Sequence, residues 1–192
     1  MNKKYLIQWF PPWGGKHDQF YSYAEVYKET LVTIINEINR EHDLFSKNSK
    51  DVHPATLANH DYGILPALFL FRHYIELQLK GMILHNGGEL KEIDSVHSIV
   101  KLLDLLKQKS NLTMISKKTE KFIFELHHLD TTSQGFRYPF EKSGKRFFET
   151  VLERDLDQVN VLSEFTDRAI KVICDLENQE GEFDYQKASQ NQ

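Results

Sequence analysis

The sequence predicts an all-α fold, namely an up-and-down helical bundle of four to five main helices with a small β-hairpin insertion. Three observations lead to this prediction. Apolar residues recur at spacings of three and four in several long segments. One of these segments is apolar around almost its whole circumference, as is typical of a helix at the centre of a bundle. Clusters of glycine, proline and small polar residues separate the segments.

Length and composition favour one domain. The chain has 192 residues, of which 40% are hydrophobic and 27% are charged, as is ordinary for a globular protein. A chain of this size can bury a core large enough to need no metal or disulfide. We expect an N-terminal arm over residues 1–17, a single helical domain over 18–178 and a flexible tail over 179–192.

The first helix is predicted over residues 18–43, where Asp18 can cap its start and apolar residues keep the helical spacing. Residues 44–60 are polar and contain Pro54, so we expect a long loop there.

The central helix is predicted over residues 62–85. Pro66 should lie in its first turn, where a missing N–H costs little. The stop signal is Asn86-Gly87-Gly88, because glycine readily adopts the left-handed conformation that ends many helices. Since this segment is apolar all round, we expect it to be the most buried element.

Three further helices and the hairpin follow. Helical spacing predicts helices over 95–109 and 117–129, the second capped by Ser116, and a last helix over 151–178. Residues 136–149 place aromatic residues around a Ser-Gly turn, which favours a small hairpin.

An ionic ridge interrupts the central apolar helix. Arg72, Glu76 and Lys80 are spaced by four, so they share one side of the helix. Buried charge must be paired and hydrogen-bonded, and Glu76 could bridge the two cations as a structural ion-pair ladder. The alternative is a polar cleft for a phosphate, a base or a scissile RNA bond, since ionisable groups in a core often mark sites.

Other polar residues stand near the ends of the predicted helices. His97 opens one helix, while His127, His128 and Asp130 close the next, where a histidine can also cap the helix C-terminus. No spacing among these residues matches a known zinc pattern, so we expect no metal and no cofactor. The single cysteine, Cys174, lies in an apolar helical stretch and is expected to be buried.

The charge and the hydropathy pattern argue against two classes of partner. The net charge of −4 argues against polyanion binding by bulk electrostatics. The basic stretch between the helices over 95–109 and 117–129 is most simply a solvated face; its residues are Lys101, Lys107, Lys109, Lys117, Lys118 and Lys121. No apolar run is long enough to cross a bilayer and no signal peptide is visible, so we expect a cytoplasmic protein with no membrane partner.

Four short features resemble the HEPN superfamily of small helical bundles. They are the central Arg-His-Tyr-Ile-Glu-Leu-Gln-Leu-Lys of residues 72–80, the His97-Ser98 that opens a helix, Asp130 with Ser133, and Phe136-Arg137-Tyr138-Pro139. The resemblance covers roughly residues 60–175. It implies a nucleotide- or RNA-binding bundle that dimerises, in a prokaryotic defence or toxin system.

The resemblance does not extend to the family's nuclease motif. Ribonuclease members share an arginine followed, after four to six residues, by a histidine, and none of the six arginines here has a histidine at that spacing. Whether the protein is an enzyme is therefore left open by the sequence. If it is one, His73 or His97 would act as the acid–base, because imidazole titrates near neutral pH.

The leading hypothesis is therefore an RNA- or nucleotide-binding homodimer with a polar cleft. The residues expected to line or adjoin the cleft are Arg72, Glu76, Lys80, His97, Asp130, Arg137 and Tyr138. The alternative is a non-catalytic dimerisation or protein-interaction module, in which aromatic residues of the arm and hairpin form the interface and the ionic ridge is structural. A metal-dependent hydrolase is the third hypothesis, and the sequence does not identify a partner protein.

Overall fold

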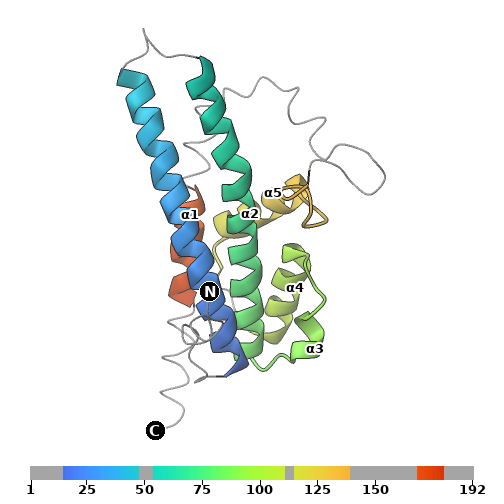
Figure 1. The fold of residues 1–192 in the computed structure, drawn as a ribbon. Helices are drawn as coiled ribbons and strands as arrows, with labels where there is room; N and C mark the ends of the chain where they lie inside the picture. Colours follow the sequence, from blue (N-terminus) through green and yellow to red (C-terminus); the bar gives the residue numbers. More distant parts are fainter. Residues whose placement is uncertain (1–14, 48–53, 111–114, 139–167, 180–192) are drawn as a thin grey trace, which may run out of the picture.

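Two long antiparallel helices organise the molecule (Figure 1). The computed structural model describes residues 15–47, 54–110, 115–138 and 168–179. Helix α1 spans Lys16–Lys47 and helix α2 spans Pro54–His85. The short α3 (Leu90–Ile93), α4 (Ile99–Lys109) and α5 (Lys117–Leu129) follow α2. Residues 168–179 form a further helix, and no strand occurs among the described residues.

The α1–α2 pair is longer than the sequence predicted. The loop expected over 44–60 is mostly helical, because α1 continues to Lys47 and α2 begins at Pro54. Proline is favoured in the first turn of a helix, so Pro54 marks the start that was assigned to Pro66. Pro66 instead lies inside α2.

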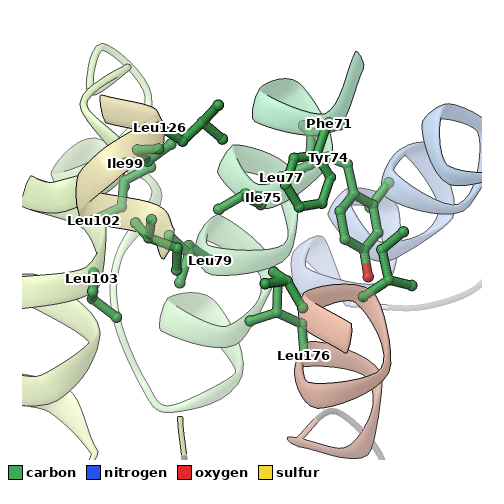
Figure 2. Packing of buried hydrophobic residues seen from close by; sticks show 14 of the residues in the cluster. Phe71, Tyr74, Ile75, Leu77, Leu79, Ile99, Leu102, Leu103, Leu126 and Leu176 are labelled. Carbon is green, nitrogen blue, oxygen red and sulfur yellow. The ribbon is translucent and has the colours of Figure 1, made fainter. Parts of the chain in front are cut away.

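Helix α2 lies at the centre of the described fold, as predicted. It packs against α1 on one side and against α4 on another, and α4 in turn contacts α5. Figure 2 shows α2 side chains between Leu102 and Leu126 on one side and Leu176 on the other. Burial of each Leu or Ile side chain contributes about 1.5–3 kcal/mol, so this layer supplies much of the fold's stability.

Close packing between α1 and α2 depends on Gly81. A Cβ atom at this position would lie 2.5 Å from Cε1 of Tyr21 on α1, a distance that no side chain tolerates. The absence of a side chain at Gly81 therefore leaves room for the Tyr21 ring between the two helices.

The helix ends after α2 agree in part with the sequence. The predicted glycine stop is confirmed: α2 ends at His85, Gly87 has φ +81°, and the Gly88 N–H donates to Ile83 O at 2.9 Å. Helix α5 has the predicted bounds, and Ser116 Oγ accepts from Thr119 N.

One predicted helix starts later than expected, and a short helix precedes the predicted segment. The segment expected over 95–109 contains only α4, which starts where the Ser98 side chain accepts from Lys101 N, and the single turn of α3 precedes it. Helix capping by Ser98 explains this start, because a serine before a helix satisfies an otherwise unpaired N–H.

Three other predictions need correction or concern residues outside the described ranges. The hairpin over 136–149 is not seen: residues 136–138 form no strand, and the remainder lies outside the described residues. The part of the last helix before residue 168 lies outside them too. Cys174 is exposed rather than buried, so it belongs to the outer face of the helix over 168–179.

Candidate functional site

The ionic ridge of α2 is buried. The side chains of Arg72, Glu76 and Lys80 are 2%, 3% and 6% exposed. Glu76 Oε1 accepts from Lys80 Nζ at 2.9 Å, and Glu76 Oε2 lies 3.6 Å from Arg72 Nη1. The ladder predicted from the spacing is therefore present, with Glu76 between the two cations.

Arg72 joins this ladder to two segments far away in the sequence. Its Nη2 donates to His97 O and its Nη1 donates to Ser133 Oγ, both at 2.8 Å. Its Nε lies 4.0 Å from Asp130 Oδ2. Burial lowers the pKa of the Arg72 guanidinium, and the nearby carboxylates of Asp130 and Glu76 oppose that shift. One buried arginine thus fixes the start of α4 and the turn after α5.

Asp130 organises that turn. Its Oδ1 accepts from the N–H groups of Gln134 and Gly135, each at 3.0 Å. Within the turn, Ser133 has φ +64°, a left-handed conformation that costs a non-glycine residue on the order of 1–2 kcal/mol. The hydrogen bonds to the Asp130 carboxylate and from Arg72 hold the turn in this conformation.

His97 connects the buried carboxylate to the surface. Its Nδ1 lies 3.0 Å from Glu76 Oε1, although its side chain is 63% exposed. An ionised carboxylate can only accept, and the histidine tautomer that donates to it carries its proton on Nδ1. In that tautomer, Nε2 is the atom able to accept a proton from a ligand.

His73, the other predicted acid–base, lies in a different environment. It is half-buried, with its ring centroid 4.4 Å from that of Tyr27 on α1 and 5.9 Å from that of Phe69. Burial lowers the pKa of His73 below its ordinary 6.5, which favours the neutral ring. His73 is therefore placed as an aromatic packing group, and His97 is the better candidate for proton transfer.

Arg137 and Tyr138 are exposed beside the ladder. Arg137 Nε donates to Ser133 O at 2.9 Å, and its Nη2 donates to the same oxygen. Its guanidinium carbon lies 5.6 Å from the Phe69 ring centroid and 5.7 Å from that of Tyr138. Tyr138 is 55% exposed. Ser133 therefore accepts from Arg72 inside the protein and from Arg137 at its surface.

The structure brings most of the predicted site residues into one network. Arg72, Glu76, Lys80 and Asp130 form its buried part, and His97 and Arg137 are its exposed ends. Ser133 and Phe69 were not among the predicted site residues. The run Asp-Thr-Thr-Ser-Gln-Gly over 130–135 has the composition of a side-chain-capped turn, which was the available signal for Ser133.

The described residues include no group of three or more His, Cys, Asp or Glu side chains placed to hold a metal ion. His127 lies near the network, and burial and the positive charge of Arg72 lower its pKa. No helix in the described part of the chain is long and apolar enough to span a membrane.

These observations define an all-helical bundle with a buried charged network that reaches the surface at a histidine and an arginine. A model of the HEPN domain family matches residues 42–175, which is more than half of the chain. The protein therefore belongs to the HEPN domain family, as the resemblance implied. Comparisons with curated proteins and with solved structures give no match.

Proposed function

We propose that this HEPN protein binds RNA or a nucleotide phosphate at the surface formed by His97 and Arg137. Membership of the family suggests a role related to nucleotides or RNA, or a toxin-like role. The observation that carries the proposal is the contact between exposed His97 and buried Glu76, at 3.0 Å. A carboxylate behind an exposed imidazole orients the ring and fixes which nitrogen faces a ligand.

Burial changes the role proposed for the ladder. Arg72, Glu76 and Lys80 are too enclosed to contact a polyanion, and their charges are already paired with one another. They act as positioning residues for His97 and for the turn that carries Arg137. Arg137 supplies the phosphate contact, because a guanidinium offers several donors in one plane. Two of these donors bond Ser133 O, which orients the plane and leaves the other donors for a phosphate.

A cleavage step, if the protein catalyses one, would use His97 rather than His73. His97 could accept the proton of a ribose 2′-hydroxyl through Nε2 as that oxygen attacks the adjacent phosphate. The bond from phosphorus to the 5′-oxygen of the next nucleotide breaks in this step, and the leaving 5′-oxygen takes a proton from water. Glu76 would stabilise the imidazolium that forms, since it accepts from Nδ1. The setting in a defence or toxin system and the homodimer stay part of this proposal, resting on the family.

The second candidate is a non-catalytic interaction module with a structural ladder. The burial of Arg72, Glu76 and Lys80 favours it, since a sealed ladder needs no ligand to satisfy its charges. The aromatic arm that would form its interface lies outside the described residues. The two candidates differ in whether the parent protein binds RNA at all.

The test compares two single-charge variants in an RNA-binding titration at several salt concentrations. Arg137→Ala should weaken binding of a short unstructured RNA and reduce the slope of log affinity against log salt by about one. Lys118→Ala is the matched control, because it removes one exposed positive charge from α5. Equal losses in the two variants would indicate bulk electrostatics rather than a site.

Absence of RNA and nucleotide binding by the parent protein would contradict the proposal and favour the interaction module. His97→Asn separates binding from cleavage. If the parent cleaves RNA, this variant should lose cleavage while its affinity for uncleavable RNA changes little, because the ring acts on protons rather than as the phosphate anchor.

A further inference from the structure

Five planar groups form a continuous column that ends at the surface beside the proposed phosphate contact. The column runs from Tyr27 on α1 through His73 and Phe69 on α2 to Arg137 and Tyr138. The successive centroid separations are 4.4 and 5.9 Å for the rings, then 5.6 and 5.7 Å for the guanidinium carbon to Phe69 and to Tyr138. The His73 and Phe69 planes are nearly parallel, at 11°, whereas Tyr27 meets His73 edge to face, at 72°.

The inner end of the column is held firmly. Phe69 and His73 are one helical turn apart on α2 and both are partly buried, and Tyr27 contacts His73 from α1. The guanidinium of Arg137 is fixed edge-on by its two hydrogen bonds to Ser133 O, so its planar faces remain available to the rings. The Tyr138 N–H donates to Gln134 O at 2.9 Å, which fixes the backbone that carries the last ring.

The outer end is open. Tyr138 is 55% exposed although it lies at the end of this series of contacts. Exposed aromatic rings next to a guanidinium are the means by which proteins stack unpaired bases, since every base has a π-face and the neighbouring cation contacts the phosphate. In a duplex the bases are stacked on each other and cannot reach such a ring.

We propose that Tyr138 stacks an unpaired base, so that the RNA bound at this surface is single-stranded. This inference rests on the proposed function and names its substrate class. Arg137 then has two roles. Its positive charge contacts the phosphate of the same nucleotide, and its guanidinium packs against the Tyr138 ring. Phe69 and His73 are positioning residues for that guanidinium.

The experiment measures affinity by fluorescence anisotropy for a short unstructured RNA, for a blunt duplex of the same sequence, and for AMP. The parent should prefer the single strand. Tyr138→Ala should weaken single-strand binding by about fivefold to a hundredfold, the range found when a base-stacking aromatic is replaced by alanine. Tyr138→Phe should keep the parent affinity, because stacking needs the ring and not the hydroxyl.

Tyr23→Ala is the matched control, since Tyr23 on α1 is similarly exposed at 48%. If the parent binds RNA while Tyr138→Ala and Tyr23→Ala behave alike, the inference fails and the proposed function stands. Equal affinity of the parent for duplex and single strand would also overturn the inference. If Tyr138→Ala weakens binding of the single-stranded RNA but not of AMP, stacking on Tyr138 depends on a continuous strand. If the parent binds none of the three ligands, both proposals are overturned.

Discussion

Two neighbouring ridges of α2 have the same spacing and are stabilised in different ways. The ionic ridge, Arg72, Glu76 and Lys80, is buried, and each charge has a specific partner. The aromatic ridge, Phe69 and His73, packs edge to face against Tyr27 at one end and lies against the Arg137 guanidinium at the other. Successive helical residues point about 100° apart, so adjacent Arg72 and His73 belong to these different environments.

The comparison shows what sets the tolerance of each ridge to substitution. An ion pair in the core requires a partner of opposite charge at hydrogen-bonding distance, so loss of one member leaves another uncompensated. A stack of planar groups requires shape, and another ring of similar size can replace one member.

Loss of the central carboxylate should have the largest effect. Glu76→Ala leaves Arg72 and Lys80 buried without their shared anion and removes the acceptor for His97 Nδ1. We expect the free energy of unfolding to fall by about 3–5 kcal/mol in chemical denaturation. A loss below about 1 kcal/mol would mean that water reaches the ladder in solution, as for an exposed pair.

Loss of charge at Asp130 should have an intermediate effect. Asp130→Asn keeps an oxygen that can accept from Gln134 N and Gly135 N but removes the attraction to Arg72. The expected loss of unfolding free energy is about 1–2 kcal/mol, because hydrogen bonds to charged groups are stronger than neutral ones. Asp130→Ala should cost more than Asp130→Asn, and equal costs would show that the turn does not depend on this acceptor.

The aromatic ridge should tolerate replacement of His73 by another ring. The burial of His73 should also make the free energy of unfolding depend on pH. Burial lowers the pKa of His73 below 6.5, so the unfolded chain binds a proton more readily than the folded protein does. Its contribution to stability is therefore present above pH 6.5 and is lost as the pH falls from 6.5 toward the lower folded-state pKa.

His73→Phe should change the unfolding free energy at pH 7 by less than about 1 kcal/mol and should weaken this acid dependence. Part of the dependence should remain, because the pKa of His127 is also lowered. Denaturation series at several pH values provide the measurement, and an unchanged pH profile would contradict the assignment of His73 to the buried stack.

The exposed end of the column should contribute least to stability. Tyr138→Ala should change the unfolding free energy by less than about 0.5 kcal/mol, since surface substitutions rarely do more. Thermal or chemical denaturation of this variant beside the parent provides the measurement. A large loss would mean that the ring is part of the core rather than a free stacking surface.

The sequence predicted the fold class, the central place of α2 and the charged ridge, because these depend on spacing alone. The glycine stop after α2 and the Ser116 cap were also predictable, since both are local signals. The extents of α1 and α2 were underestimated because residues 44–60 resemble a loop in composition, whereas 44–47 belong to α1 and 54–60 to α2.

The surroundings of the ridge could not be predicted from spacing. Arg72 lies 25 residues from the carbonyl of His97 and 61 residues from Ser133, and only the packing of α2 against the following elements brings these groups together. The same packing separates His73 from His97, which the sequence treated as equal candidates. Cys174 was misplaced because an apolar stretch does not tell which side of the helix faces the core.

The turn at Ser133 restricts which amino acids can occupy that position in related sequences. Its φ of +64° excludes valine, isoleucine and threonine, whose branched Cβ clashes in the left-handed region. Glycine would suit the backbone but would lack the hydroxyl that accepts from Arg72 Nη1. Asparagine and aspartate satisfy both demands, because they tolerate this conformation and carry a short acceptor. Variation among relatives at this position should therefore be confined to serine, asparagine and aspartate wherever the arginine of α2 is kept.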